Sequence, residues 1–108
     1  MSVLMEFSIF PTDKGESVSA YVGEVIRMIR DSGLEYRLTP MGTVIETEDL
    51  AEALAVVEKA GNILQAQECK RIYSAIKLDI RAGKSGRLEQ KIRSVEQRIG
   101  EVSRTDRA

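Results

Sequence analysis

The feature that most constrains this chain is the order in which its hydrophobic pattern changes period. Residues 3–9, 34–38, 43–47 and 72–80 alternate apolar with polar side chains or are rich in β-branched residues, which predicts four strands. From residue 17, from residue 48 and from residue 88, apolar residues recur every three or four positions instead, which predicts three helices. The predicted order is strand, helix, strand, strand, helix, strand, and a terminal helix.

Local sequence supports these boundaries. Ser17 is the expected N-cap of the first helix and Gly33 its C′ residue, while Thr47 or Glu48 lies near the cap of the second helix. Residues 40–42, Pro-Met-Gly, supply a turn that makes the second and third strands a hairpin. This order is typical of an α+β, ferredoxin-like βαββαβ sandwich, in which two helices cover one face of a four-stranded antiparallel sheet. We expect one domain over residues 1–108.

The composition argues against several classes of partner. The chain has 16 Lys and Arg against 17 Asp and Glu, a net charge of -1, so nothing indicates the basic surface of a nucleic-acid-binding protein. No apolar run approaches the ~20 residues of a membrane span, and residues 1–10 do not resemble a signal peptide. A single cysteine, Cys69, suits a reducing compartment. We therefore expect a cytoplasmic protein that binds neither nucleic acid nor membranes.

The chain has no histidine. A Cys–His or Ser–His nucleophile pair is therefore impossible, and the commonest metal ligand is missing. No cofactor or metal-loop motif is present either, so we predict a protein that is not an enzyme and holds no cofactor or metal. The alternative is a carboxylate-dependent hydrolase that uses Glu46 and Asp79.

In the predicted fold, one face of the sheet has no helix over it. Alternation assigns carboxylates, cations and hydroxyls to that open face, namely Glu6, Ser8, Glu35, Arg37, Thr39, Lys77, Asp79 and Arg81. For residues 43–47 it allows either Val44 and Glu46 or Thr43, Ile45 and Thr47, and we choose Val44 and Glu46 because Ile45 is the better core residue. One interpretation is a solvated face, which antiparallel sheets commonly have. The other is a polar ligand site, closed by another subunit. The open face, the free strand edges and the apolar stripe of the terminal helix predict a homo-oligomer.

Three stretches resemble the small thiamine-binding protein family, which is related in fold to the thiamine/hydroxymethylpyrimidine-binding proteins. They are residues 6–11 (EFSIFP), residues 39–46 (TPMGTVIE) and residues 76–81 (IKLDIR), and the likeness extends over nearly the whole chain. The resemblance implies a ferredoxin-like fold, a homotetramer, and a site for thiamine or its hydroxymethylpyrimidine moiety near subunit contacts. The role would be carriage, storage or sensing. Ile80 and Thr47 depart from the family, whose members often have aspartate and glycine there.

The resemblance places Ser8, Thr43, Glu46 and Asp79 at or near the ligand. An aminopyrimidine has ring nitrogens and an exocyclic amine, for which carboxylates and hydroxyls are suitable partners. A carboxylate would also offset the charge of the thiazolium ring. Alternatively, Glu46 pairs with Lys77 or Arg37 across strands. The alternative function is a structural or regulatory oligomeric interaction module that has no small-molecule ligand.

Overall fold

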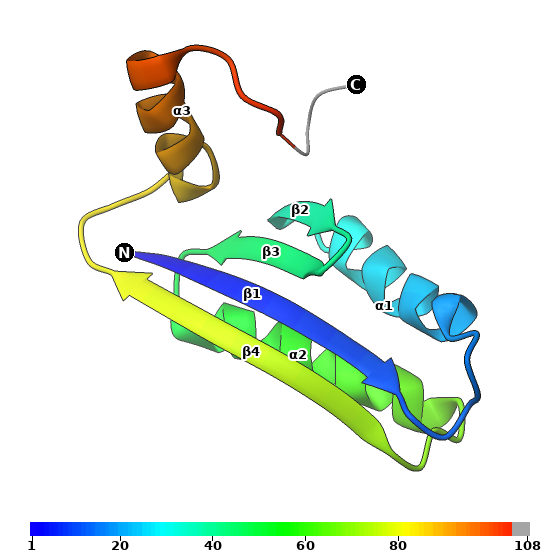
Figure 1. Ribbon diagram of the computed structural model, residues 1–108. Helices are drawn as coiled ribbons and strands as arrows, with labels where there is room; N and C mark the ends of the chain where they lie inside the picture. Colours follow the sequence, from blue (N-terminus) through cyan, green and yellow to red (C-terminus); the bar gives the residue numbers. More distant parts are fainter. Residues whose placement is uncertain (105–108) are drawn as a thin grey trace.

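A computed structural model describes residues 1–104. Its centre is an antiparallel four-stranded sheet with the strand order β2-β3-β1-β4 (Figure 1). The strands are β1 Ser2–Pro11, β2 Glu35–Thr39, β3 Gly42–Thr47 and β4 Ile72–Arg81. The two long strands, β1 and β4, lie side by side, so β1 is internal while β4 forms one edge.

Two helices, α1 Ser19–Asp31 and α2 Leu50–Ala66, cover one face of this sheet, and α3 Arg87–Ile99 stands beyond one end of it (Figure 1). The order of elements confirms the predicted ferredoxin-like βαββαβ sandwich with an added C-terminal helix. None of the helices within residues 1–104 is both long enough and apolar enough to cross a membrane.

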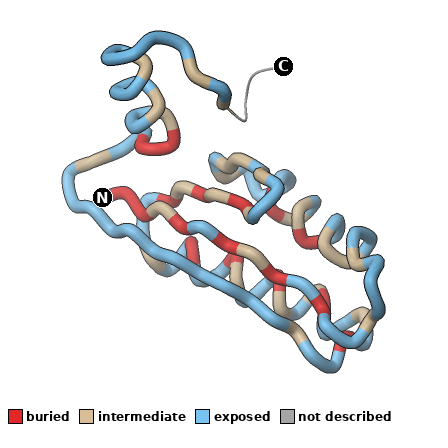
Figure 2. The backbone as a smooth tube through the Cα atoms, in the orientation of Figure 1, coloured by how far each residue is buried: buried red, intermediate tan, exposed pale blue. Residues whose placement is uncertain are grey.

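The core lies between β1, β3 and the two covering helices. The odd-numbered residues 3–9 of β1 are buried, as are Ile45 of β3, Val25 and Ile29 of α1, and Leu64 of α2. Alternation then puts the even-numbered residues of β1, with Val44 and Glu46 of β3, on the open face. The predicted division of β3 between the two faces is therefore confirmed. Figure 2 shows the consequence, because burial alternates along β1 whereas β4 is exposed along almost its whole length.

The helix ends differ in part from the prediction. The first helix begins at Ser19 after Val18, which caps it without a side-chain hydrogen bond, so the prediction of Ser17 as N-cap was wrong. The second helix is capped by Asp49, whose carboxylate accepts a hydrogen bond from the backbone N–H of Glu52 at 2.8 Å. Gly33 follows the end of α1 with a φ of 79°, a left-handed conformation that suits glycine, as expected.

Candidate functional site

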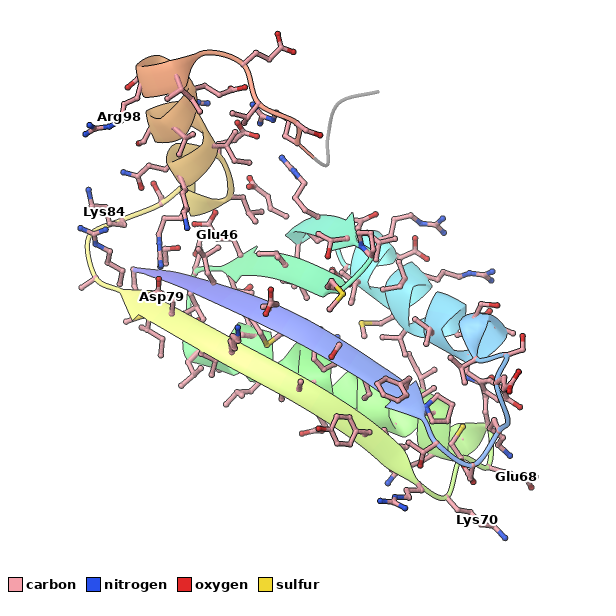
Figure 3. The ribbon with its side chains drawn as sticks, viewed as in Figure 1. Glu46, Glu68, Lys70, Asp79, Lys84 and Arg98 are labelled. Carbon is pink, nitrogen blue, oxygen red and sulfur yellow. The ribbon has the colours of Figure 1, made fainter. Side chains whose placement is uncertain are left out.

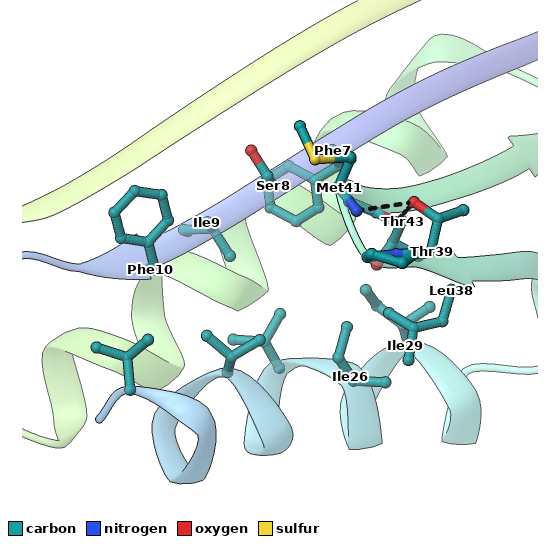
Figure 4. A pocket seen from close by; sticks show the side chains of 15 residues that line it. Phe7, Ser8, Ile9, Phe10, Ile26, Ile29, Leu38, Thr39, Met41 and Thr43 are labelled. Atoms are coloured by element: carbon teal, nitrogen blue, oxygen red, sulfur yellow. Dashed lines mark hydrogen bonds between the residues drawn. The ribbon is translucent and has the colours of Figure 1, made fainter. Parts of the chain in front are cut away.

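A hollow of about 380 Å³ opens between α1, the second half of β1 and the tip of the β2–β3 hairpin (Figure 4). Its volume falls within the range of small-molecule sites. The lining residues are Phe7, Ser8, Ile9, Phe10, Val18, Val22, Val25, Ile26, Ile29, Leu38, Thr39, Pro40, Met41, Gly42 and Thr43. None of these side chains is ionisable, and three carry hydroxyls. The hollow therefore suits a flat, uncharged ring with a few polar atoms.

The hairpin tip that forms one wall is held by its own hydrogen bonds. The hydroxyl of Thr39 donates to the carbonyl oxygen of Gly42 at 2.8 Å and accepts from the backbone N–H of Met41 at 3.2 Å (Figure 4). Gly42 has a φ of 154°, and a Cβ at this position would lie 3.1 Å from the carbonyl oxygen of Phe7. Glycine thus permits the close approach of the hairpin to β1.

The hollow exists because β1 continues past the end of its partner β3. The ladder between them stops at the pair Phe7–Thr43, whereas β1 runs on to Pro11 alongside β4. The backbone N–H of Thr12 donates to the carbonyl oxygen of Arg71 at 2.8 Å. Because backbone groups alternate sides along a strand, even-numbered residues of β1 bond to β4 and odd-numbered residues face β3. The N–H and C=O of Ile9 therefore face the hollow, with no β3 residue opposite them.

A second polar cluster lies at the other end of the β1–β3 pair, where α3 begins, and Glu46 is at its centre (Figure 3). The Glu46 carboxylate accepts hydrogen bonds from the hydroxyl of Ser2 at 2.6 Å and from the backbone N–H groups of Arg87 and Leu88 at 3.1 and 3.3 Å. The N-cap of α3 is Gly86, which has no side chain to supply. Glu46 therefore caps α3 from across the sheet.

Arg87 completes this cluster and is itself buried. Its guanidinium donates to the carbonyl oxygens of Ser2 at 3.0 Å and of Asp79 at 3.1 Å, and it forms an ion pair with the Asp79 carboxylate. Three elements are joined in this way: the start of β1, the end of β4 and the first turn of α3. Arg37 of β2 adds a further ion pair to α3, with Glu89, at 3.5 Å.

These contacts set the ionisation of Glu46. Desolvation raises its pKa, but the hydrogen bonds from Ser2, Arg87 and Leu88 and the nearby guanidinium charge outweigh burial, so the pKa of Glu46 lies below its ordinary value of 4.5. A carboxylate held ionised in this way is a structural acceptor, whereas a general acid needs a raised pKa.

The structure brings the four predicted ligand residues together in two pairs. Ser8 and Thr43 line the hollow, with the Ser8 hydroxyl directed away from α1 (Figure 4). Glu46 and Asp79 meet at Arg87. Both lie opposite Leu4 in the sheet, four residues from Ser8, or about 13 Å along an extended strand. The cross-strand partner of Lys77 is Glu6, at 3.6 Å, rather than Glu46.

Sequence reasoning did not identify the backbone of Ile9 or the side chain of Arg87 as site groups. The first strand was predicted to end at Ile9, whereas β1 continues to Pro11 and so extends beyond the six residues of β3. Arg87 follows the charged turn at residues 83–86, as the first residue of α3, and its partners Ser2 and Asp79 are brought to it only by the fold.

Comparison with known proteins fits this architecture. The family model for the thiamine-binding protein family matches residues 5–96. A UPF0045 protein of Mycobacterium bovis is 43% identical over 96 residues, which cover 89% of this chain and 93% of the relative. The crystal structure of a hypothetical protein from Methanocaldococcus jannaschii is 34% identical and superposes with a TM-score of 0.76, covering 89% of this chain and 97% of that one.

A more distant likeness concerns a Thermotoga maritima protein provisionally assigned to thiamine biosynthesis or salvage. It is 21% identical with a TM-score of 0.75, covering 88% of this chain and 99% of that one, and at this identity it shows a shared fold. The matched family model spans the sheet except the first three residues of β1, and it also spans the covering helices, the hollow and most of α3. This chain therefore belongs to the thiamine-binding protein family.

Proposed function

We propose that this protein binds thiamine or its hydroxymethylpyrimidine moiety in the hollow between α1 and the β2–β3 hairpin, and that it catalyses no reaction. The observation that carries the proposal is the edge of β1 at Ile9, which faces an otherwise apolar, uncharged space. A backbone N–H can donate to a pyrimidine ring nitrogen while the adjacent C=O accepts from the exocyclic amine. Membership of a family named for thiamine binding supports this choice of ligand.

The walls of the hollow suit the remainder of such a ring. Val22 and Ile26 of α1 and Phe7 of β1 offer apolar surface for its faces. Thr43 adds a hydroxyl, and Ser8 a second one at the rim. In this proposal Ser8 and Thr43 contact the ligand, as the resemblance implies, whereas Glu46 and Asp79 do not contact it and hold α3 in place.

The absence of catalysis is supported by the contacts of the two carboxylates. Glu46 and Asp79 both accept hydrogen bonds from Arg87, so the pair invoked by a hydrolase mechanism is engaged in holding α3. The proposed role is carriage, storage or sensing by a cytoplasmic homotetramer. The lone cysteine, a buried free thiol, is consistent with a reducing compartment.

Titration calorimetry with thiamine, hydroxymethylpyrimidine and thiamine phosphates tests the proposal. We expect binding at sub-millimolar concentration, and we expect Val22→Trp to abolish it by filling the hollow. Val95→Trp on α3, outside the hollow, is the matched control and should bind like the wild type. The proposal fails if none of the compounds binds, or if Val22→Trp is folded and binds them unchanged.

The same titration separates the two polar ends of the molecule. Glu46→Gln and Asp79→Asn should leave affinity within a few-fold of the wild type, because both residues lie away from the hollow. Thr43→Val and Ser8→Ala should weaken binding, each by about 3- to 10-fold for one lost hydrogen bond. The reverse pattern would move the ligand to the Arg87 cluster.

A further inference from the structure

Two exposed aromatic rings lie side by side where β1 extends past β3. Phe10 of β1 and Tyr73 of β4 are directly opposed in the sheet, and their ring centroids are 5.7 Å apart with the planes inclined by 40°. Phe10 is 37% exposed and Tyr73 58%, whereas the other aromatic residues of the chain, Phe7, Tyr21 and Tyr36, are buried in the core or packed against it. An exposed aromatic pair beside a hollow is typical of a ligand-binding surface.

This aromatic pair lies on the open face of the sheet and adjoins the hollow through Phe10. As an even-numbered residue of β1, Phe10 projects away from the core, and Figure 4 shows its ring on the same side of β1 as the Ser8 hydroxyl, away from α1. Phe10 also lines the hollow, as does Met41 of the hairpin tip, which is 87% exposed. On this side, the rim of the hollow therefore combines an aromatic ring, a hydroxyl and a thioether.

A ring bound at the Ile9 backbone edge is next to this rim. Phe10 directly follows Ile9, and consecutive Cα atoms are about 3.8 Å apart. In thiamine, a single methylene group joins the aminopyrimidine to the thiazolium ring. An aminopyrimidine bound at Ile9 therefore holds the thiazolium ring within reach of Phe10.

The thiazolium ring is an aromatic cation, and none of the described residues that line the hollow carries a carboxylate. Glu6, on the open face of β1, lies four residues from Phe10, about 13 Å along the strand, and pairs with Lys77 at 3.6 Å. Asp13, in the loop after β1, accepts a hydrogen bond from the backbone N–H of Lys70 at 2.8 Å. The face of an aromatic ring, in contrast, carries the negative part of its quadrupole and attracts a cation placed over it. Phe10 is therefore the group at the hollow that suits the cationic ring.

We infer that the ring of Phe10 stacks on the thiazolium ring of thiamine, and that Tyr73 packs against Phe10 and fixes its orientation. The inference rests on the proposed binding of thiamine in the hollow, and it adds that aromatic surface, rather than an ion pair, recognises the cationic half of the ligand. The protein then prefers thiamine to an uncharged analogue of the same shape. Hydroxymethylpyrimidine, which lacks the second ring, binds without the help of Phe10 and Tyr73.

Titration calorimetry with thiamine, hydroxymethylpyrimidine and deazathiamine, in which an uncharged thiophene replaces the thiazolium, tests this recognition. We expect the wild type to bind thiamine about 2- to 5-fold more tightly than deazathiamine, the size of a cation–π contact at a partly exposed site. Phe10→Leu should remove this preference and should bind hydroxymethylpyrimidine within about 2-fold of the wild type. Tyr73→Leu should reduce the preference, whereas Tyr73→Phe, the matched control that keeps the ring, should retain it.

Nuclear magnetic resonance gives a second measurement that needs no variant. In protein with isotopically labelled phenylalanine, the thiazolium methyl group of bound thiamine should show nuclear Overhauser effects to the ring protons of Phe10. Thiamine binding without these effects, or a preference for thiamine over deazathiamine that is unchanged in Phe10→Leu, overturns the stacking and leaves the proposed function intact. If none of the three compounds binds, the proposed function fails and this inference fails with it.

Discussion

The two ends of the β1–β3 pair differ in how their polar groups are used. At the α3 end, Ser2, Glu46 and Arg87 bond to one another and to backbone groups, so donors and acceptors are matched within the chain. At the hairpin end, the ladder stops at Phe7, and the backbone groups of Ile9 face an apolar hollow. A cluster whose hydrogen-bonding groups all pair within the chain stabilises the fold. A hollow bordered by a strand edge with no strand partner can instead bind a ligand. The charged residues Glu46 and Arg87 therefore mark the end of the β1–β3 pair that stabilises the fold, and the proposed ligand site is at the other end.

The substitution with the largest expected effect on the α3 end is Arg87→Met. The substitution leaves the carbonyl oxygens of Ser2 and Asp79 and the Asp79 carboxylate without their shared donor. We expect a loss of about 2–3 kcal/mol in the free energy of unfolding, measured by urea denaturation, and faster amide exchange along α3. Ligand binding in the hollow should persist.

Arg98→Met is the control for that substitution. Arg98 is also on α3 but points away from the sheet (Figure 3). Its replacement should change stability by less than about 0.5 kcal/mol, as surface substitutions usually do. Equal losses for the two arginines would mean that Arg87 is not the residue that fastens α3.

The hairpin end has its own weak point at Gly42. Gly42→Ala would bring a Cβ to 3.1 Å from the Phe7 carbonyl oxygen at a φ of 154°. We expect a loss of about 1–3 kcal/mol and weaker ligand binding, because the hairpin must move relative to the hollow. Gly61→Ala, in the middle of α2 with open space around it, should instead stabilise the protein by roughly 0.5–1 kcal/mol. If Gly42→Ala and Gly61→Ala both raise, or both lower, the free energy of unfolding, the proposed role of Gly42 is contradicted.

The fold could be predicted from sequence because it depends on periodicity. The alternation that buries Ile45 and turns Glu46 toward the open face is visible in five residues of sequence. The site depends instead on where strands stop relative to each other. Glu46 was correctly assigned to the open face, yet its partners Ser2 and Arg87 lie 44 and 41 positions away. No local pattern reveals such contacts, and the Ile9 edge depends on the different lengths of β1 and β3.

Acid should weaken the α3 end specifically. The folded-state pKa of Glu46 lies below its ordinary 4.5, so the stabilisation by this carboxylate is complete above pH 4.5 and is lost as the pH falls through the folded value. Stability measured by urea denaturation from pH 7 to pH 2.5 should therefore fall less steeply in Glu46→Gln than in the wild type. The gap between the two proteins should narrow toward low pH.

Asp13 must be separated from this effect. A hydrogen bond from the backbone N–H of Lys70, at 2.8 Å, lowers the pKa of Asp13 below its ordinary value of 3.8, so the contribution of Asp13 to stability is also lost in acid. Asp13→Asn should remove the contribution of Asp13 to the pH dependence of stability without changing amide exchange in α3. A gap between the wild type and Glu46→Gln that stays constant with pH would contradict an ionised cap on α3.

The smallest expected effect concerns the charge of the ligand. No carboxylate lines the hollow in the described part of the chain, so the thiazolium cation of thiamine gains no ion pair there. Hydroxymethylpyrimidine should therefore bind within about 10-fold of thiamine, and raising the salt from 50 to 500 mM should change either affinity by less than about 2-fold, because screening acts on charge pairs. Calorimetry at the two salt concentrations measures both quantities. If thiamine binds far more tightly than the pyrimidine and salt weakens it, a carboxylate must contact the ligand. Asp79→Asn, tested in the same titration, would then distinguish the Arg87 cluster from an acidic group contributed by a neighbouring copy.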